Sequence, residues 1–219
     1  MSPRCSRNVT ARAQRLARGA ALLAAAVIAL AGCNATAPTP SVVMVAPVTQ
    51  APMGVRDTAY NPALPEPALQ LTDQAGQAFD LRSLLGTPAF VYFGYTHCPD
   101  VCPTTLAGLR AAVQAANLPA KVVFVTVDPA RDTAPAMKQY LDAYKAGFIG
   151  LTGSADQIAA AAAAWGVAYK AGPADSNGNY PMSHTSDVYL VDGSGMLRNH
   201  IFFGAPSTMI AALLREVSS

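Results

Sequence analysis

The chain has 219 residues, with 15 lysine and arginine residues against 13 aspartate and glutamate residues and a net charge of +2. Five arginines and no acidic residues lie within residues 1–32, so the rest of the chain carries 10 basic and 13 acidic residues, 10 − 13 = −3. That balance excludes the basic surface typical of nucleic-acid-binding proteins. Without residues 1–32, 219 − 32 = 187 residues remain, enough for one domain with a hydrophobic core.

The N-terminal segment has the pattern of a secretory signal, because its arginines precede an uncharged apolar stretch at 20–31. That stretch has 12 residues, and a spanning helix needs about 20. A signal peptide at 1–32 is therefore favoured over a retained membrane helix. The sequence Leu-Ala-Gly-Cys at 30–33 resembles a bacterial lipoprotein box. It predicts a lipidated Cys33 and a protein that is exported and lipid-anchored to the extracytoplasmic face of a membrane.

Residues 33–67 contain seven prolines, few charges and no periodic pattern. This composition predicts an extended tether that separates the folded domain from the membrane. The folded domain is then expected at 68–219.

The rest of the chain predicts alternating strands and helices around one mixed sheet, an α/β fold that opens with a hairpin. The predicted strands cover 69–72, 77–81, 89–95, 121–127, 186–191 and 196–203. The predicted helices begin near Pro103 and Thr133 and cover 154–165 and 206–217. The carboxyl ends of the central strands are where a functional site is expected.

Four cysteines occur, at 5, 33, 98 and 102. Cys5 would leave with the signal and Cys33 would carry lipid, so the folded domain keeps Cys98 and Cys102. These two follow a predicted strand, and Cys102 lies at the start of a helix, where the helix dipole and backbone N–H groups favour a thiolate. In an oxidising compartment such a pair forms a disulfide, binds a metal or alternates between the two, and the C-x-x-x-C spacing does not decide among these.

Two thiolates are soft ligands that favour Cu(I), and imidazole also suits copper. The chain has three histidines, at 97, 184 and 200. His184 ends a loop rich in glycine, proline and asparagine and could fold over the cysteines. His97 adjoins Cys98 but is expected to point elsewhere, since neighbours on an extended segment face opposite ways. His200 is expected to be structural or exposed.

Four segments, taken together, resemble the Sco/SenC family: 93–103, 125–133, 148–153 and 180–192. The resemblance covers about 69–219 and implies a thioredoxin-like fold with copper ligands at Cys98, Cys102 and His184. The copper is expected as Cu(I), with Cu(II) as a second candidate state. The resemblance also implies delivery of copper to the dinuclear copper site of cytochrome c oxidase during assembly. The implied partners are the oxidase subunit that carries this site and another copper chaperone.

The main alternative is a thiol–disulfide reductase that keeps the cysteines of the oxidase copper site reduced, with Cys98 and Cys102 as its redox pair. Whether the protein is an enzyme is therefore left open, with a metal carrier favoured. A structural zinc site is disfavoured because it needs four ligands and only three candidates occur. Asp100 could tune the charge of the cysteine loop or meet a partner. Asp128 and Arg131 are expected to serve in a turn or a helix cap, with support of the metal ligands as the alternative role.

Overall fold

A computed structural model describes residues 57–219. The predicted signal peptide, Cys5, Cys33 and the tether up to residue 56 lie outside the described residues. Within residues 57–219, no helix is both long enough and apolar enough to span a membrane.

An eight-stranded sheet forms the centre of the domain, in the order β1-β10-β9-β4-β5-β6-β2-β3, and a separate two-stranded sheet pairs β7 with β8. The strands are β1 (Asp57–Pro65), β2 (Gln70–Asp73), β3 (Ala78–Asp80), β4 (Ala89–Gly94), β5 (Lys121–Thr126), β6 (Ile149–Thr152), β7 (Tyr169–Ala171), β8 (Met182–His184), β9 (Val188–Val191) and β10 (Met196–Ile201). The helices are the 3-10 turn η1 (Leu81–Leu84), α1 (Val101–Ala116), α2 (Ala134–Asp142), α3 (Ala155–Ala164) and α4 (Ser207–Val217).

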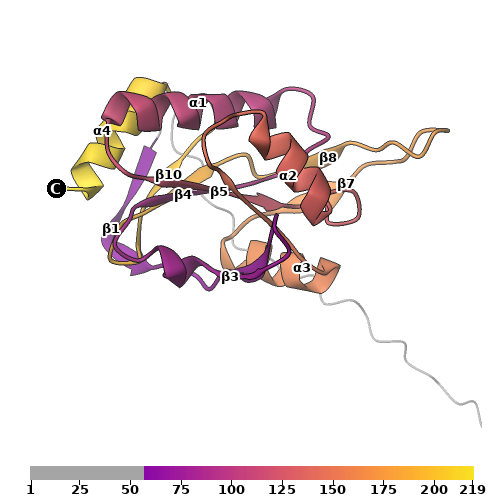
Figure 1. The fold of residues 1–219 in the computed structure, drawn as a ribbon, viewed down its shortest axis with the longest axis horizontal. Helices are drawn as coiled ribbons and strands as arrows, with labels where there is room; N and C mark the ends of the chain where they lie inside the picture. Colours follow the sequence, from indigo (N-terminus) through magenta and orange to yellow (C-terminus); the bar gives the residue numbers. More distant parts are fainter. Residues whose placement is uncertain (1–56) are drawn as a thin grey trace, which may run out of the picture. The chain divides into compact units, whose positions relative to one another are not determined.

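The central strands β4, β5 and β6 run parallel, and β9, β10, β1, β2 and β3 add antiparallel pairs on the two sides. Helices cover both faces, with α1 and α4 on one side and α3 on the other (Figure 1). The predicted mixed sheet with an opening hairpin is confirmed, because β2 and β3 pair around the turn at 73–77.

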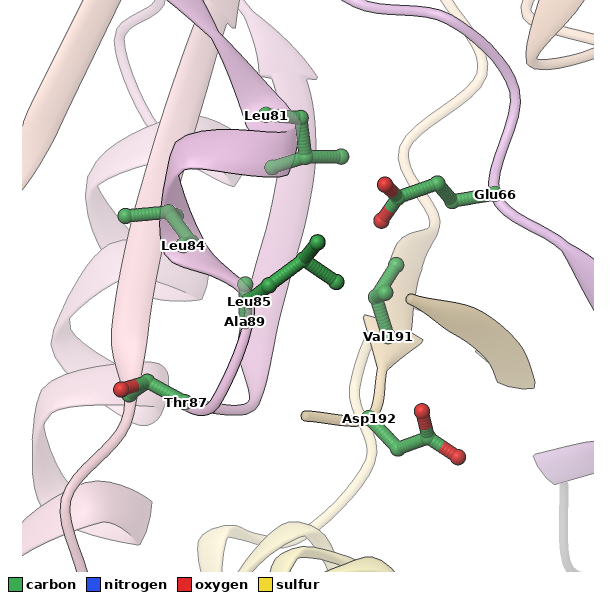
Figure 2. A pocket seen from close by; sticks show the side chains of 8 residues that line it. All are labelled: Glu66, Leu81, Leu84, Leu85, Thr87, Ala89, Val191 and Asp192. Carbon is green, nitrogen blue, oxygen red and sulfur yellow. The ribbon is translucent and has the colours of Figure 1, made fainter. Parts of the chain in front are cut away.

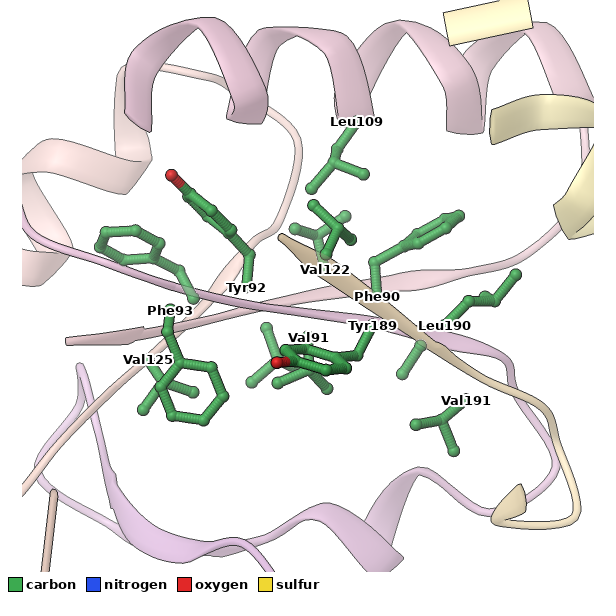
Figure 3. Packing of buried hydrophobic residues seen from close by; sticks show 14 of the residues in the cluster. Phe90, Val91, Tyr92, Phe93, Leu109, Val122, Val125, Tyr189, Leu190 and Val191 are labelled. Atoms are coloured by element: carbon green, nitrogen blue, oxygen red, sulfur yellow. The ribbon is translucent and has the colours of Figure 1, made fainter. Parts of the chain in front are cut away.

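The core is built around β4, of which all six residues are buried. Phe90 and Tyr92 point toward Leu109 of α1, whereas Val91 and Phe93 point to the opposite face (Figure 3). A central strand that is buried on both faces needs no polar alternation, so a continuous apolar run such as Ala-Phe-Val-Tyr-Phe forms a strand here.

Hydrogen bonds to capping side chains fix where α2 and α3 begin. The Thr133 hydroxyl accepts a hydrogen bond from the Ala136 N–H at the start of α2. Ser154 and Gln157 form a reciprocal capping box at the start of α3. Both helices begin within a residue or two of the predicted positions.

Residues 57–65 form strand β1, whereas the sequence placed them in the tether. The strand pairs with β10, with a register shift between Ala59 and Leu64. It lies at the edge of the sheet, where prolines such as Pro62 and Pro65 are tolerated because one side has no strand to bond. The folded part of the chain therefore begins before residue 68.

Three further strands were not predicted: β6, β7 and β8. Each has only three or four residues, too few to show a clear period. Strands β7 and β8 make a hairpin from what the sequence indicated to be a loop, and His184 is its last paired residue, opposite Tyr169.

Candidate metal centre

The two cysteines lie where the buried strand β4 gives way to α1. Cys98 is half-buried in the connecting loop, and Cys102 is fully buried in the first turn of the helix. Both are free thiols. The backbone N–H of Cys102 donates to the Cys98 sulfur across 3.3 Å, so the turn that starts the helix also fixes one sulfur over its N-terminus.

The two thiols differ in acidity. Burial acts to raise the pKa of Cys98, but hydrogen bonds from the backbone N–H groups of Cys102 and Asp100 outweigh it, and the pKa lies below its usual value. Burial raises the pKa of the Cys102 thiol to about 12, so the thiolate that its place at the start of a helix predicted is wrong for this cysteine, because burial outweighs the effect of the helix start. Cys98 is therefore the more nucleophilic sulfur, and Cys102 keeps its proton at neutral pH until something replaces it.

His184 faces the buried cysteine from the hairpin. Its Nε2 lies 3.6 Å from the Cys102 sulfur, and its Nδ1 lies 2.8 Å from the carbonyl oxygen of Thr185. A carbonyl only accepts, so Nδ1 carries the proton and the Nε2 lone pair is left toward the sulfur. Burial lowers the pKa of His184, which also favours the neutral ring that binds metals.

Aromatic side chains pack against the His184 ring. The rings of Tyr92 and Tyr95 meet the His184 ring edge-on, with centroids 6.3 Å and 5.8 Å away. An open pocket leads to the cysteine loop and is lined by Tyr95, Cys98, Pro99, Asp100, Val101, Met182, Ser183, His184 and Ser186. A partner can therefore approach Cys98 and His184, whereas Cys102 is fully buried and does not line this pocket.

The donor set fits a soft monovalent ion, since two sulfurs and one neutral imidazole nitrogen lie near the N-terminal end of α1. A separation of 3.6 Å between Cys102 and His184 suits two ligands of one ion, given metal–ligand bonds of about 2.0 to 2.3 Å. Within residues 57–219, no three His, Cys, Asp or Glu side chains are already grouped as a metal cage.

The other two histidines lie outside this set. His97 is exposed, and its Nδ1 lies 3.1 Å from the Thr96 hydroxyl and 3.7 Å from Asp132. His200 bonds Asp187 across 2.8 Å and stacks on the ring of Tyr189 at 5.1 Å. His200 therefore has the structural role that the sequence predicted.

Two acidic residues near the site make contacts within their own segments. Asp100 precedes α1 and accepts a hydrogen bond from the Thr104 hydroxyl, 3.3 Å away. Asp128 pairs with Arg131 in the turn after β5, as predicted.

Asp132 was missed by sequence reasoning. It is fully buried and accepts hydrogen bonds from the Thr96 N–H, the Thr96 hydroxyl and the Thr126 hydroxyl. It thereby ties the start of the cysteine loop to the end of β5. An acidic residue just after a buried strand was the available signal, but its neighbours on another segment could not be read from the sequence.

A second pocket lies at the start of β4, where Ala89 is the first residue of the strand (Figure 2). It is lined by Glu66, Leu81, Leu84, Leu85, Thr87, Ala89, Val191 and Asp192. Burial raises the pKa of the Glu66 carboxyl there. No cysteine or histidine reaches this pocket, so it offers no soft ligand.

A family model described as SCO1/SenC matches residues 58–219. The chain belongs to the SCO1/SenC family. The SCO2-like protein of Rickettsia conorii is 37% identical over 152 residues, which cover 67% of this SCO1/SenC chain and 74% of that protein. The family predicted from the four sequence segments is thus confirmed.

Solved structures of the family share the fold. The structure of Bradyrhizobium japonicum ScoI with copper bound is 36% identical, has a TM-score of 0.63 and covers 71% of this chain and 99% of that one. Yeast Sco1 with copper bound is 29% identical, also with a TM-score of 0.63, over 72% of this chain and 90% of that one. The predicted thioredoxin-like fold is confirmed.

Proposed function

We propose that this SCO1/SenC chain is a copper carrier that holds one Cu(I) ion with Cys98, Cys102 and His184. The observation that carries the proposal is the approach of His184 Nε2 to the Cys102 sulfur, 3.6 Å away, with its Nδ1 proton held by a backbone carbonyl. An imidazole oriented in this way presents its lone pair to an ion on the sulfur. The copper-bound structures of family members support the choice of metal.

Cys98, Cys102 and His184 have different roles in binding the ion. Cys98, half-buried and with the lower pKa of the two thiols, meets the incoming ion first. Cys102 then gives up its proton and becomes the buried sulfur ligand, and His184 completes a three-coordinate site. Release is the reverse: a partner with its own soft ligands takes the ion by ligand exchange from the open side of the pocket.

The destination of the ion and the location of the carrier belong to the same proposal. The ion would go to the dinuclear copper site of cytochrome c oxidase during its assembly, with the subunit that carries this site as the partner and another copper chaperone as the donor. The predicted signal peptide and Cys33 would export the chain and anchor it by lipid to the extracytoplasmic face of a membrane. The prolines of 33–56 would give the domain reach.

The test is a Cu(I) titration of the reduced full-length chain in detergent, in competition with a chromogenic chelator. The wild type is expected to bind one equivalent. Cys98→Ser and Cys102→Ser should abolish tight binding, and His184→Ala should weaken it less, since the soft thiolates dominate. His200→Ala, which changes a histidine outside the site, is the matched control. Stoichiometric tight binding by Cys98→Ser would overturn the assignment.

A second candidate function is thiol–disulfide reduction, favoured by one observation: the accessible thiol has the lowered pKa and the buried thiol the raised one. Such a pair can attack a partner disulfide through Cys98 and resolve the mixed disulfide through Cys102. The oxidase copper-site cysteines would then be the substrate. Weak copper binding together with rapid reduction of a model disulfide would favour this reading.

A further inference from the structure

The hairpin that carries His184 is tied to the rest of the domain by Tyr180. The Tyr180 hydroxyl donates to Asp128 Oδ1 across 2.8 Å, although 52 residues separate the two in sequence. The Arg131 guanidinium lies over the Tyr180 ring, 3.6 Å from its centroid. Asp128 and Arg131 belong to the turn after β5, so one side chain of the hairpin contacts two side chains at the carboxyl end of a central strand of the main sheet.

The turn that contacts Tyr180 also has hydrogen bonds of its own. Asp128 is buried, and its backbone N–H donates to the Thr126 hydroxyl across 2.8 Å. Its Oδ2 accepts from Arg131 Nε, which leaves Oδ1 for Tyr180. A carboxylate held in this way is a rigid acceptor, and charge-assisted hydrogen bonds are the stronger kind.

Arg131 also depends on the tyrosine. Its Nη2 atom is buried without a hydrogen-bond acceptor. The negative face of an aromatic ring attracts a guanidinium, and the Tyr180 ring occupies that position. Tyr180 therefore satisfies both members of the Asp128–Arg131 pair, one through its hydroxyl and the other through its ring.

The hairpin needs such a tie because its own sheet is small. Strand β8 pairs only with β7 and is not part of the eight-stranded sheet. An isolated two-stranded hairpin is marginally stable in water. His184 lies four residues after Tyr180 on the same short run of chain. Arg131 also contacts Tyr95 at 5.9 Å, and the Tyr95 ring meets the His184 ring.

We infer that Tyr180, Asp128 and Arg131 form a latch that positions His184 over the cysteine pair. They are positioning residues, because all three act through the hairpin and the bonds between them do not involve the sulfurs. With the latch closed, the His184 imidazole is held at the Cys102 sulfur. With the latch open, the hairpin is free to move and His184 leaves while the two cysteines stay in place. The role of His184 as a ligand rests on the proposed copper-carrier function, but the latch itself is a property of the metal-free chain.

The latch determines the order in which the three ligands release the copper ion. A carrier must hold its ion tightly and also give it up, and removal of one of three ligands opens a position for a ligand of the partner. Since Tyr180 belongs to the hairpin that carries His184, opening of the latch frees the hairpin, and His184 is the ligand that departs first. Latch opening then controls the rate of release to a competing chelator or a partner site.

Two variants of the full-length chain separate the two contacts of Tyr180, and a third variant is a control. Tyr180→Phe keeps the ring over Arg131 and removes the hydrogen bond to Asp128. Tyr180→Leu keeps an apolar cover but removes both contacts. Tyr60→Phe, on the edge strand β1, is the matched control for the loss of a tyrosine hydroxyl.

The first measurement is amide hydrogen exchange of the reduced, metal-free chain, followed by mass spectrometry over peptides that cover 169–185. Exchange in this segment is expected to rise about tenfold in Tyr180→Phe and about a hundredfold in Tyr180→Leu, with β4 and β5 unchanged. The second measurement is the rate of Cu(I) release to a chelator, which should rise in the same order. Tyr60→Phe should match the wild type in both.

The outcomes distinguish the latch from the proposed function. Unchanged exchange in Tyr180→Leu would overturn the latch, whatever the copper result. Faster exchange with an unchanged release rate would show that the contacts hold the hairpin but do not position a ligand, and would overturn the inference. A wild type that binds no Cu(I) but shows the expected exchange series would remove the copper-carrier function and leave the latch in place.

Discussion

The Cys102 sulfur and His184 Nε2 lie 3.6 Å apart, although 82 residues separate them in the chain. Cys102 lies in the first turn of α1, and His184 is the last residue of β8. The contact therefore joins the main domain to a hairpin outside the central sheet. In the proposed copper carrier, this arrangement would give one rigid and one movable ligand to the same ion, which suits a carrier better than a permanent metal site.

The two cysteines should differ strongly in their rate of alkylation. Cys98 is half-buried with a lowered pKa, whereas Cys102 is fully buried and its pKa is raised to about 12. We expect iodoacetamide to modify Cys98 about a hundredfold faster than Cys102 in the reduced, native chain. Peptide mass spectrometry over a time course measures this ratio. The two rates should converge in denaturant, and equal rates in the native chain would contradict the assigned acidities.

The apparent affinity for Cu(I) should rise with pH. The pKa of the Cys102 thiol is raised to about 12, so between pH 7 and 9 this thiol is protonated in the free protein and loses its proton when the ion binds. Each proton released on binding makes the affinity increase about tenfold per pH unit, and at least one proton is released, that of Cys102. His184, whose pKa is lowered, is already neutral in this range and adds no proton.

Chelator competition at pH 7, 8 and 9 measures the slope. His184→Ala is expected to bind more weakly at each pH but to keep the slope of the wild type. An affinity that does not change over this range would contradict a protonated Cys102.

Gly94→Ala should destabilise the end of β4 and disturb the buried cysteine. A Cβ atom at Gly94 would lie 2.6 Å from Phe124 Cε2 and 3.0 Å from the Cys102 sulfur. Overpacking of this kind costs about 1 to 3 kcal/mol, which denaturant unfolding would measure. Gly108→Ala is the control, because a Cβ there meets nothing within 4 Å and alanine favours a helix by about 1 kcal/mol. Equal stability of the two variants would contradict the close contact.

Asp132→Asn should weaken the link between the cysteine loop and β5. The buried carboxylate accepts three hydrogen bonds from Thr96 and Thr126, and an amide can replace only part of that acceptor capacity. We expect a loss of about 2 kcal/mol in the free energy of unfolding. Asp142→Asn removes an exposed ion pair with Lys138 and should cost less than about 0.5 kcal/mol. Similar losses in both variants would show that Asp132 has no special role.

Most of the domain could be predicted from local sequence. The buried run at 89–94, the Thr133 cap and the Ser154 capping box each depend on residues within a few positions, so their elements were found. The edge strand β1 was missed because its prolines are typical of a linker, and only the neighbouring β10 shows that they lie at a sheet edge. The hairpin of β7 and β8 was missed because its strands are too short to show a period.

The sequence by itself determined the family, the α/β fold and the three candidate ligands, because the residues of each motif are close together in the chain. Only the tertiary structure decided how these ligands meet. It set the opposite pKa shifts of Cys98 and Cys102, which depend on burial, and the direction of the His184 lone pair, which depends on the Thr185 carbonyl. It also brought Tyr180 to Asp128 and Arg131, a contact between distant segments that exists only once the sheet and the hairpin have formed.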